Sequence, residues 1–139
     1  MRNKLLVFPA TAIFLLLSLG GSTFAHHGFV SWFDMSRSVS VKGTVTGFEW
    51  TNPHTYIYLD VKNEKGGIEE WRIELGAPGM LARAGWRKDT LKPGDKTTVT
   101  GPRAKNGAPD MNLSHQSRIV MTDSGKEIHN SIAAKGGDN

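Results

Sequence analysis

The chain has 139 residues, with 17 Lys and Arg against 13 Asp and Glu, five histidines and no cysteine. Without cysteine, disulfides, thiolate metal sites, c-type haem attachment and cysteine nucleophiles are excluded. A metal site must therefore use histidine, carboxylate, methionine or amino-terminal ligands. The charges are interspersed, with no block of five like charges, which argues against nucleic-acid binding as the main role.

Residues 1–25 have the pattern of a secretory signal peptide. Arg2 and Lys4 precede an apolar run, and Thr23 and Ala25 place small residues at −3 and −1 of a cleavage site. The apolar run is about 15 residues long, shorter than the roughly 20 residues that a membrane span requires. We therefore predict cleavage after Ala25 and a periplasmic or secreted protein with no membrane span in its mature form. A retained N-terminal anchor is the alternative.

Removing 25 of the 139 residues leaves 114, with 15 basic and 13 acidic side chains, so the net charge falls from +4 to +2. That length suits one domain whose hydrophobic core is stable without disulfide bonds. We divide the chain into a signal peptide (1–25), an N-terminal arm (26–36), a β-barrel domain (37–129) and a flexible tail (130–139).

Alternating apolar and polar positions predict a first strand over residues 38–50. Its apolar phase changes near Gly43 and Gly47, so we expect a bulge at one of them. A turn over residues 50–54 leads to a second strand, 55–62, and a hairpin loop, 63–67. The remaining predicted elements are a third strand (68–75), a short helix (78–84), a fourth strand (96–101), a polar loop (102–114), a fifth strand (116–121) and a short sixth strand (126–128).

This order of elements is that of an oligomer-binding barrel, a five-stranded Greek-key barrel. Such barrels bind ligands on the face of strands 2 and 3 and at the loops after strands 1 and 4. We therefore predict a mostly β fold, a small barrel of five to six strands with one short helix between strands 3 and 4. Another small β-barrel or a β-sandwich is the alternative.

Several short motifs resemble an uncharacterised family of exported bacterial domains. They are His26-His27-Gly28-Phe29, Val41-Lys42-Gly43-Thr44-Val45, Glu49-Trp50-Thr51-Asn52-Pro53-His54, Glu74-Leu75-Gly76-Ala77-Pro78, Gly85-Trp86, Leu91-Lys92-Pro93-Gly94-Asp95 and Val99-Thr100-Gly101. The resemblance covers roughly residues 26–123. It implies export and a small β-barrel, and it implies no activity. The tail after Thr122 departs from the family pattern, which leaves no family role for His129, and we read that histidine as a tail residue.

Cleavage after Ala25 would make a chelating segment of His26 and His27. In one arrangement, a histidine brace, the free amine and the ring of His26 bind Cu(II) together with a second imidazole. In the other, the amine, a deprotonated amide and the His27 ring bind one Cu(II) in a plane. We predict His54 and His115 as further metal ligands, because both lie at loops that should be neighbours in the barrel. The alternative is that His26 and His27 are solvated side chains and that His54 caps its own turn.

A second candidate site is the outward face of the second and third strands. Tyr56, Tyr58 and Arg72 point outward there, with Trp50 at the edge, and could stack a sugar or a peptide. The alternative is a solvated sheet face with cross-strand ion pairs.

No Gly-x-Ser-x-Gly elbow, phosphate loop or His-Glu-x-x-His motif is present, so we do not expect an enzyme. The sequence favours a non-catalytic domain that binds a metal ion, with copper as the leading candidate. A domain that binds a protein or a saccharide is the second hypothesis, and a copper enzyme is a distant third.

Overall fold

The computed structural model describes residues 31–113 and 117–130. The chain divides into two units, residues 1–31 and 32–139, and the described residues fall almost wholly in the second. The predicted signal peptide, most of the predicted arm, His115 and the residues beyond 130 lie outside the described residues. Among the residues that are described, no helix is long and apolar enough to cross a bilayer.

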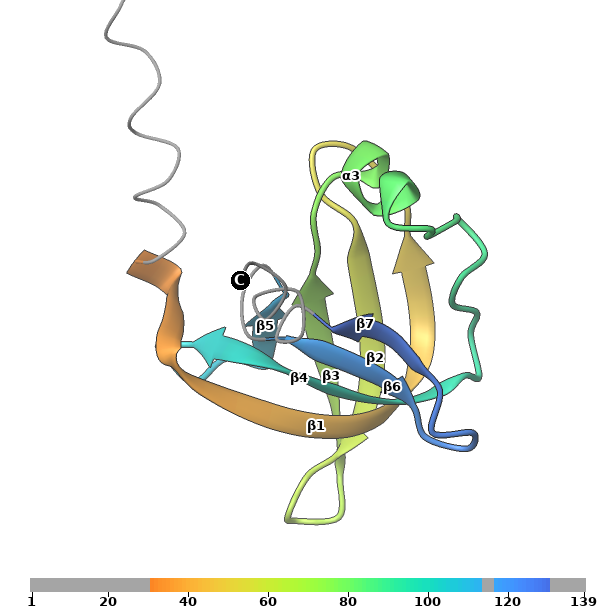
Figure 1. Cartoon of the computed structure of the whole chain (residues 1–139). Helices are drawn as coiled ribbons and strands as arrows, with labels where there is room; N and C mark the ends of the chain where they lie inside the picture. Colours follow the sequence, from red (N-terminus) through yellow and green to blue (C-terminus); the bar gives the residue numbers. More distant parts are fainter. Residues whose placement is uncertain (1–30, 114–116, 131–139) are drawn as a thin grey trace, which may run out of the picture. The chain divides into compact units, whose positions relative to one another are not determined.

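The described residues form seven strands and one short helix, shown in Figure 1. In chain order they are β1 (Phe33–Glu49), β2 (Tyr56–Lys62), β3 (Ile68–Glu74), α3 (Pro78–Arg83), β4 (Lys96–Ala104), β5 (Asp110–Asn112), β6 (Arg118–Met121) and β7 (Glu127–Asn130). The helix begins at Pro78, whose fixed φ suits a first helical turn, and Gly85, at φ +89°, follows its end. The prediction of a mostly β chain with one short helix between the third and fourth strands is confirmed.

The first five strands close into a barrel because β1 pairs with two neighbours. Residues 43–49 of β1 pair with β2, and residues 33–44 pair with β4. β2 continues to β3, β3 pairs in parallel with β5, and β5 pairs with β4, which completes the ring. β6 pairs with residues 97–100 of β4, and β7 pairs with β6, so these two strands extend the sheet beyond the ring. The predicted five-stranded barrel is confirmed.

The strand that closes the barrel is not the predicted one. We expected a loop over residues 102–114 and a fifth strand over 116–121, but β4 continues to Ala104 and the closing strand is β5, only three residues long. Three residues are too few for an alternating pattern to stand out from a polar loop. The segment that does alternate, β6, pairs with residues 97–100 of β4 outside the barrel.

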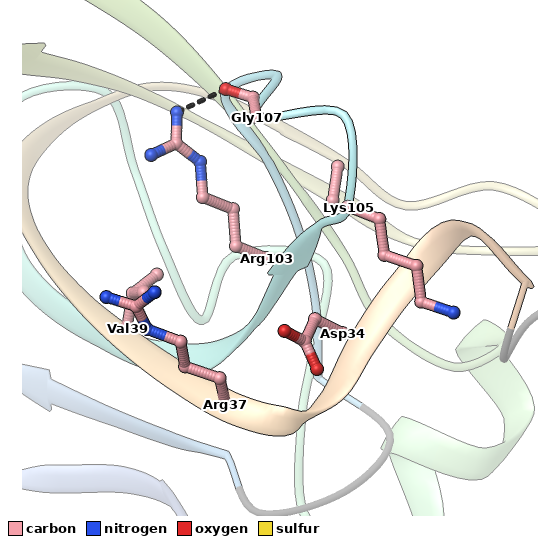
Figure 2. A pocket seen from close by; sticks show the side chains of 7 residues that line it. Asp34, Arg37, Val39, Arg103, Lys105 and Gly107 are labelled. Carbon is pink, nitrogen blue, oxygen red and sulfur yellow. Dashed lines mark hydrogen bonds between the residues drawn. The ribbon is translucent and has the colours of Figure 1, made fainter.

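Two predicted boundaries also move. β1 begins at Phe33, inside the region that we assigned to the N-terminal arm, and β7 ends at Asn130, at the predicted start of the tail. Phe33 is buried and pairs with Ala104, which explains why the strand starts earlier than the polar residues after it suggest. The ends of β1 and β4 border a small hollow, shown in Figure 2.

The predicted bulge in β1 is present, as a register shift against β2 between Val45 and Gly47. A Cβ atom at residue 47 would lie 3.2 Å from Cδ2 of Tyr58. The glycine therefore leaves room for the Tyr58 ring on the outer surface of the sheet.

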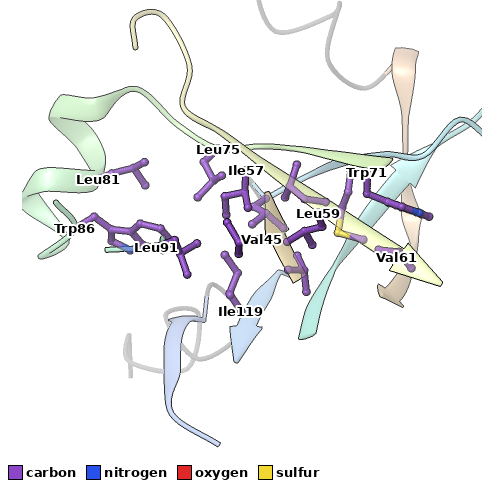
Figure 3. Packing of buried hydrophobic residues seen from close by; sticks show 14 residues of the cluster. Val45, Ile57, Leu59, Val61, Trp71, Leu75, Leu81, Trp86, Leu91 and Ile119 are labelled. Carbon is purple, nitrogen blue, oxygen red and sulfur yellow. The ribbon is translucent and has the colours of Figure 1, made fainter. Parts of the chain in front are cut away.

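Alternate residues of β2 and β3 fill the barrel, as the sequence pattern predicts. Ile57 and Leu59 of β2 and Ile73 of β3 have no exposed surface, and Trp71 is 4% exposed. Figure 3 shows Ile57 and Leu59 in the middle of this cluster, with Trp71 on one side and, on the other, Leu81 and Trp86, which come from α3 and the turn after it. The inward residues are thus used for packing, and the outward residues of the same strands remain for function.

Candidate functional site

The outward side chains of β2 and β3 form one continuous surface with those of their neighbouring strands. Tyr56 lies opposite Glu74, and Tyr58 lies opposite Arg72. Glu49 of β1 is opposite Tyr56 on the other side, and Asp110 of β5 is opposite Arg72. We call this surface the β2–β3 face, and it comprises Glu49, His54, Tyr56, Tyr58, Arg72, Glu74 and Asp110.

Arg72 is fixed at the centre of this face. Its Nε and Nη2 atoms each donate to one carboxylate oxygen of Asp110 at 2.8 Å, a bidentate contact. The bonds to Asp110 raise the pKa of Arg72. Its guanidinium carbon also lies 5.6 Å from the centroid of the Tyr56 ring, within cation–π range. The pair is partly exposed, so its contribution to stability is small, but it holds the guanidinium in one position.

The two tyrosines keep their protons at neutral pH. The Tyr58 hydroxyl donates to a Glu49 oxygen at 3.0 Å, and this hydrogen bond raises the pKa of Tyr58. Burial raises the pKa of Tyr56, and the nearby Glu74 carboxylate adds to the effect. Thr51 donates a further hydrogen bond to Glu49 at 3.2 Å. Both tyrosines are therefore protonated at neutral pH, and the Tyr58 hydroxyl is a fixed hydrogen-bond donor.

His54 lies at the edge of the β2–β3 face, in the loop between β1 and β2. Its Nδ1 atom is 2.9 Å from Oε1 of Glu74, and the two side chains are 45% and 16% exposed. The backbone beside it is held to the residues that follow β3. The Thr55 N–H donates to the carbonyl oxygen of Gly76, and the Leu75 N–H donates to the carbonyl oxygen of Thr55. Nε2 of His54 makes no hydrogen bond to any described residue. A carboxylate that holds one ring nitrogen and leaves the other available is the arrangement that orients metal-binding histidines.

The charge of the face favours cations. Besides Glu49, Glu74 and Asp110, the outward positions of β2 and β3 carry Asp60 and Glu70, which are opposite each other. The outward cations of these two strands are Arg72, which already pairs with Asp110, and Lys62, at the hairpin end of β2. The surface around His54 therefore presents an excess of carboxylates to an incoming ion.

A family model matches residues 13–112, and its description is a family of unknown function, DUF6152. The chain belongs to this family. Searches of curated proteins and of solved structures gave no significant match. The match fits the uncharacterised family that the motifs resemble. Since the function of DUF6152 is unknown, membership supplies no activity, and the site has to be argued from its own geometry.

The structure brings together only some of the residues that we predicted for the DUF6152 chain. Tyr56, Tyr58 and Arg72 lie on one face, as expected. Trp50 is half-buried and packs on Phe48, with ring centroids 5.8 Å apart, so it contributes to the apolar cluster. Of the predicted metal ligands, His26, His27 and His115 lie outside the described residues. Within the described part of the chain, no three His, Asp or Glu side chains are grouped so that they could hold a metal ion.

The assignment of His129 to the tail is wrong. His129 lies on β7, where its Nε2 atom is 3.1 Å from Oγ of Ser117 and its ring meets Trp86 edge-on at 6.2 Å. Burial lowers its pKa. Met111 is fully buried in the core and acts in packing.

Sequence reasoning missed three carboxylates of the face as partners. Glu74 lies two residues after Arg72 on β3, so both side chains were predicted to point outward. The contact of Glu74 with His54 depends on the turn at residues 50–54. That turn contains a cis peptide bond between Asn52 and Pro53. Asp110 was hidden by the interpretation of residues 102–114 as a loop, and Glu49 by the bulge that precedes it.

Proposed function

We propose that this protein is an exported, non-catalytic binding domain that holds Cu(II) with His54 and the mature His26–His27 segment. The observation that supports this proposal is the contact between Nδ1 of His54 and Glu74 at 2.9 Å. It orients the ring and leaves Nε2 available to an ion, as a carboxylate does when it accepts from a metal-binding histidine.

Copper suits the remaining donors. Cu(II) prefers nitrogen ligands in a tetragonal arrangement and has the highest affinity among the divalent metals of the first row. A mature N-terminus at His26 would add an amine and an imidazole, and His27 would add a second imidazole or an amide nitrogen. His115 is the alternative for the remaining position. The acidic β2–β3 face would raise the local concentration of a divalent cation.

The first test combines intact mass with a copper titration of protein exported by its own signal. We expect a mass that begins at His26, one tightly held Cu(II) and a nitrogen-rich paramagnetic spectrum. Glu74→Gln should lower the copper affinity by about 10- to 100-fold, because it removes the carboxylate that orients His54. Glu70→Gln is the matched control, since it removes the same charge from the same strand face without touching His54.

Two results would contradict the proposal. Tight copper binding that survives deletion of His26 and His27 would exclude the N-terminal segment as the site. Equal losses from Glu74→Gln and Glu70→Gln would mean that the carboxylates act only through net charge, and that His54 is not a ligand.

A second candidate function is the binding of a protein or a saccharide by the β2–β3 face. It is favoured by the fixed guanidinium of Arg72 beside the partly exposed Tyr56 and Tyr58 rings, because aromatic rings with fixed polar groups stack and orient such ligands. Tyr58→Ala should abolish capture of such a ligand and leave copper binding unchanged, whereas His26→Ala should have the reverse effect.

A further inference from the structure

A second charged region lies around Arg103, and its lining includes neither His54 nor Glu74. A hollow of about 250 Å³ includes Asp34, Arg37 and Lys105 among its lining residues, and Figure 2 shows their charged groups near β1 and β4. A larger hollow of about 700 Å³ lies beside the β2–β3 hairpin. Arg103 contributes to the walls of both. The two hollows are therefore adjacent parts of one concave region.

This region has the opposite charge to the β2–β3 face. Its basic residues are Arg37, Lys42, Lys62, Lys65, Arg103 and Lys105, against three carboxylates, those of Asp34, Glu64 and Glu69. Two of the carboxylates are engaged: Asp34 accepts from Ser36, and Glu69 accepts from the indole of Trp71 at 2.9 Å. Lys42, Lys62 and Lys65 form no ion pair with any described residue. Their charges are therefore available to an external anion.

The centre of the region is rigid and partly apolar. The guanidinium of Arg103 lies 4.8 Å from the centroid of the Trp71 ring and donates to the carbonyl oxygens of Gly107 and Ala108. Val41, Val61 and Trp71 also line the larger hollow. Val61 and Trp71 are buried, so an occupant would meet the partly exposed Val41 beside the lysine side chains.

The larger hollow also borders an open strand edge. β4 pairs with β1 along one edge, and β2 covers the other edge only from residue 43 onward. No described strand pairs with that second edge over residues 39–42, and Ser40, Val41 and Lys42 line the hollow. An open edge of this kind offers backbone hydrogen-bonding groups to an added strand.

From these observations we propose that the region binds an acidic, extended peptide segment, which adds as a strand beside residues 39–42 of β1. Side chains of a strand alternate between its two sides. One set of the segment's side chains would place carboxylates near Lys42, Lys62 and Lys65, and the other set would lie against the partly exposed Val41. A phosphate or sugar polymer would satisfy the lysines but not the backbone edge, so a peptide accounts for both features.

The test is a fluorescence-anisotropy titration of the full-length protein with a labelled peptide that alternates Glu and Val, at low salt. The double variant Lys62→Glu/Lys65→Glu should weaken binding by about tenfold or more, because like charges then face each other. Lys92→Glu/Lys126→Glu is the matched control: both lysines lie outside the two hollows, and the change in net charge is the same. N-methylation of alternate peptide nitrogens should also weaken binding by about tenfold, since it removes the donors of an added strand.

Three outcomes would overturn the proposal. Equal losses in the two double variants would mean that only net charge matters. Undiminished binding of the N-methylated peptide, or equally tight binding of inorganic polyphosphate, would exclude strand addition. No binding of the alternating peptide at low salt would exclude the site altogether. Copper affinity, measured separately, should be the same in both double variants, so failure here is distinguishable from failure of the copper proposal.

Discussion

The two histidines that the structure describes have different surroundings, and the difference decides what each can do. His54 is half-exposed and is held at one ring nitrogen by Glu74. His129 lies against Trp86 and Ser117, and its burial disfavours the charged form. The first can therefore offer a ring nitrogen to a ligand, whereas the second supports the packing of β7.

The burial of His129 predicts that the protein loses stability in mild acid. The pKa of His129 in the folded chain lies below the ordinary value of 6.5, so the unfolded chain binds the proton more readily. Stability from this group is therefore complete above pH 6.5 and falls as the pH drops through and below that value. The free energy of unfolding, measured with urea between about pH 7.5 and about pH 5.5, should fall more in the native protein than in His129→Gln.

Between about pH 7.5 and about pH 5.5, the loss of stability caused by His129 is separate from any effect of the carboxylates, whose ordinary pKa values are near 4. Glu127 acts in the opposite direction, since its charge favours protonated His129, but its effect is smaller than that of burial. An unfolding free energy that stays constant or rises on acidification in the native protein would contradict the prediction.

At the level of strands, the close approach of β4 and β5 depends on one glycine. A Cβ atom at Gly101 would lie 2.9 Å from Cδ2 of Leu113 and 3.1 Å from the carbonyl oxygen of Asn112. We therefore expect Gly101→Ala to lower the free energy of unfolding by about 1–3 kcal/mol, the usual cost of overpacking a core. Urea denaturation followed by fluorescence would measure the change.

Gly79→Ala provides the matched control for this substitution. A Cβ atom at residue 79 would meet nothing within 4 Å, and the residue lies in α3, so alanine there should stabilise the protein by up to about 1 kcal/mol. If Gly101→Ala were equally harmless, the short β5 would be loosely packed and would not close the barrel in solution.

The strands also show which parts of the fold could be predicted from the sequence. β2 and β3 each have seven residues with a clean alternation, and their inward and outward faces were both predicted correctly. β5 was missed because three residues carry no detectable period, and Asp110 was missed with it. The contact between His54 and Glu74 could not be predicted, because it depends on how the turn between β1 and β2 returns to the end of β3. The alternating pattern thus identified the outward face of β2 and β3, whereas tertiary contacts decided which of its side chains meet.

The domain as a whole carries opposite charges on two surfaces. Carboxylates dominate the β2–β3 face, whereas lysine and arginine dominate the concave region around Arg103. The nearly neutral net charge of the chain after residue 25 conceals this separation, because the two regions cancel. A surface of each sign allows one small domain to hold a cation and an acidic partner at separate places, as the two proposals require.

The core indicates that β6 and β7 fold together with the barrel. Ile119 of β6 and Ile57 of β2 have no exposed surface and belong to the same apolar cluster. Each isoleucine-to-alanine variant should lower the free energy of unfolding by about 2–5 kcal/mol. In a single cooperative unit, tryptophan fluorescence and far-ultraviolet circular dichroism should give coincident transitions in both variants. If Ile119→Ala instead splits the circular dichroism transition while Ile57→Ala does not, β6 and β7 are a separate element that melts away from an intact barrel.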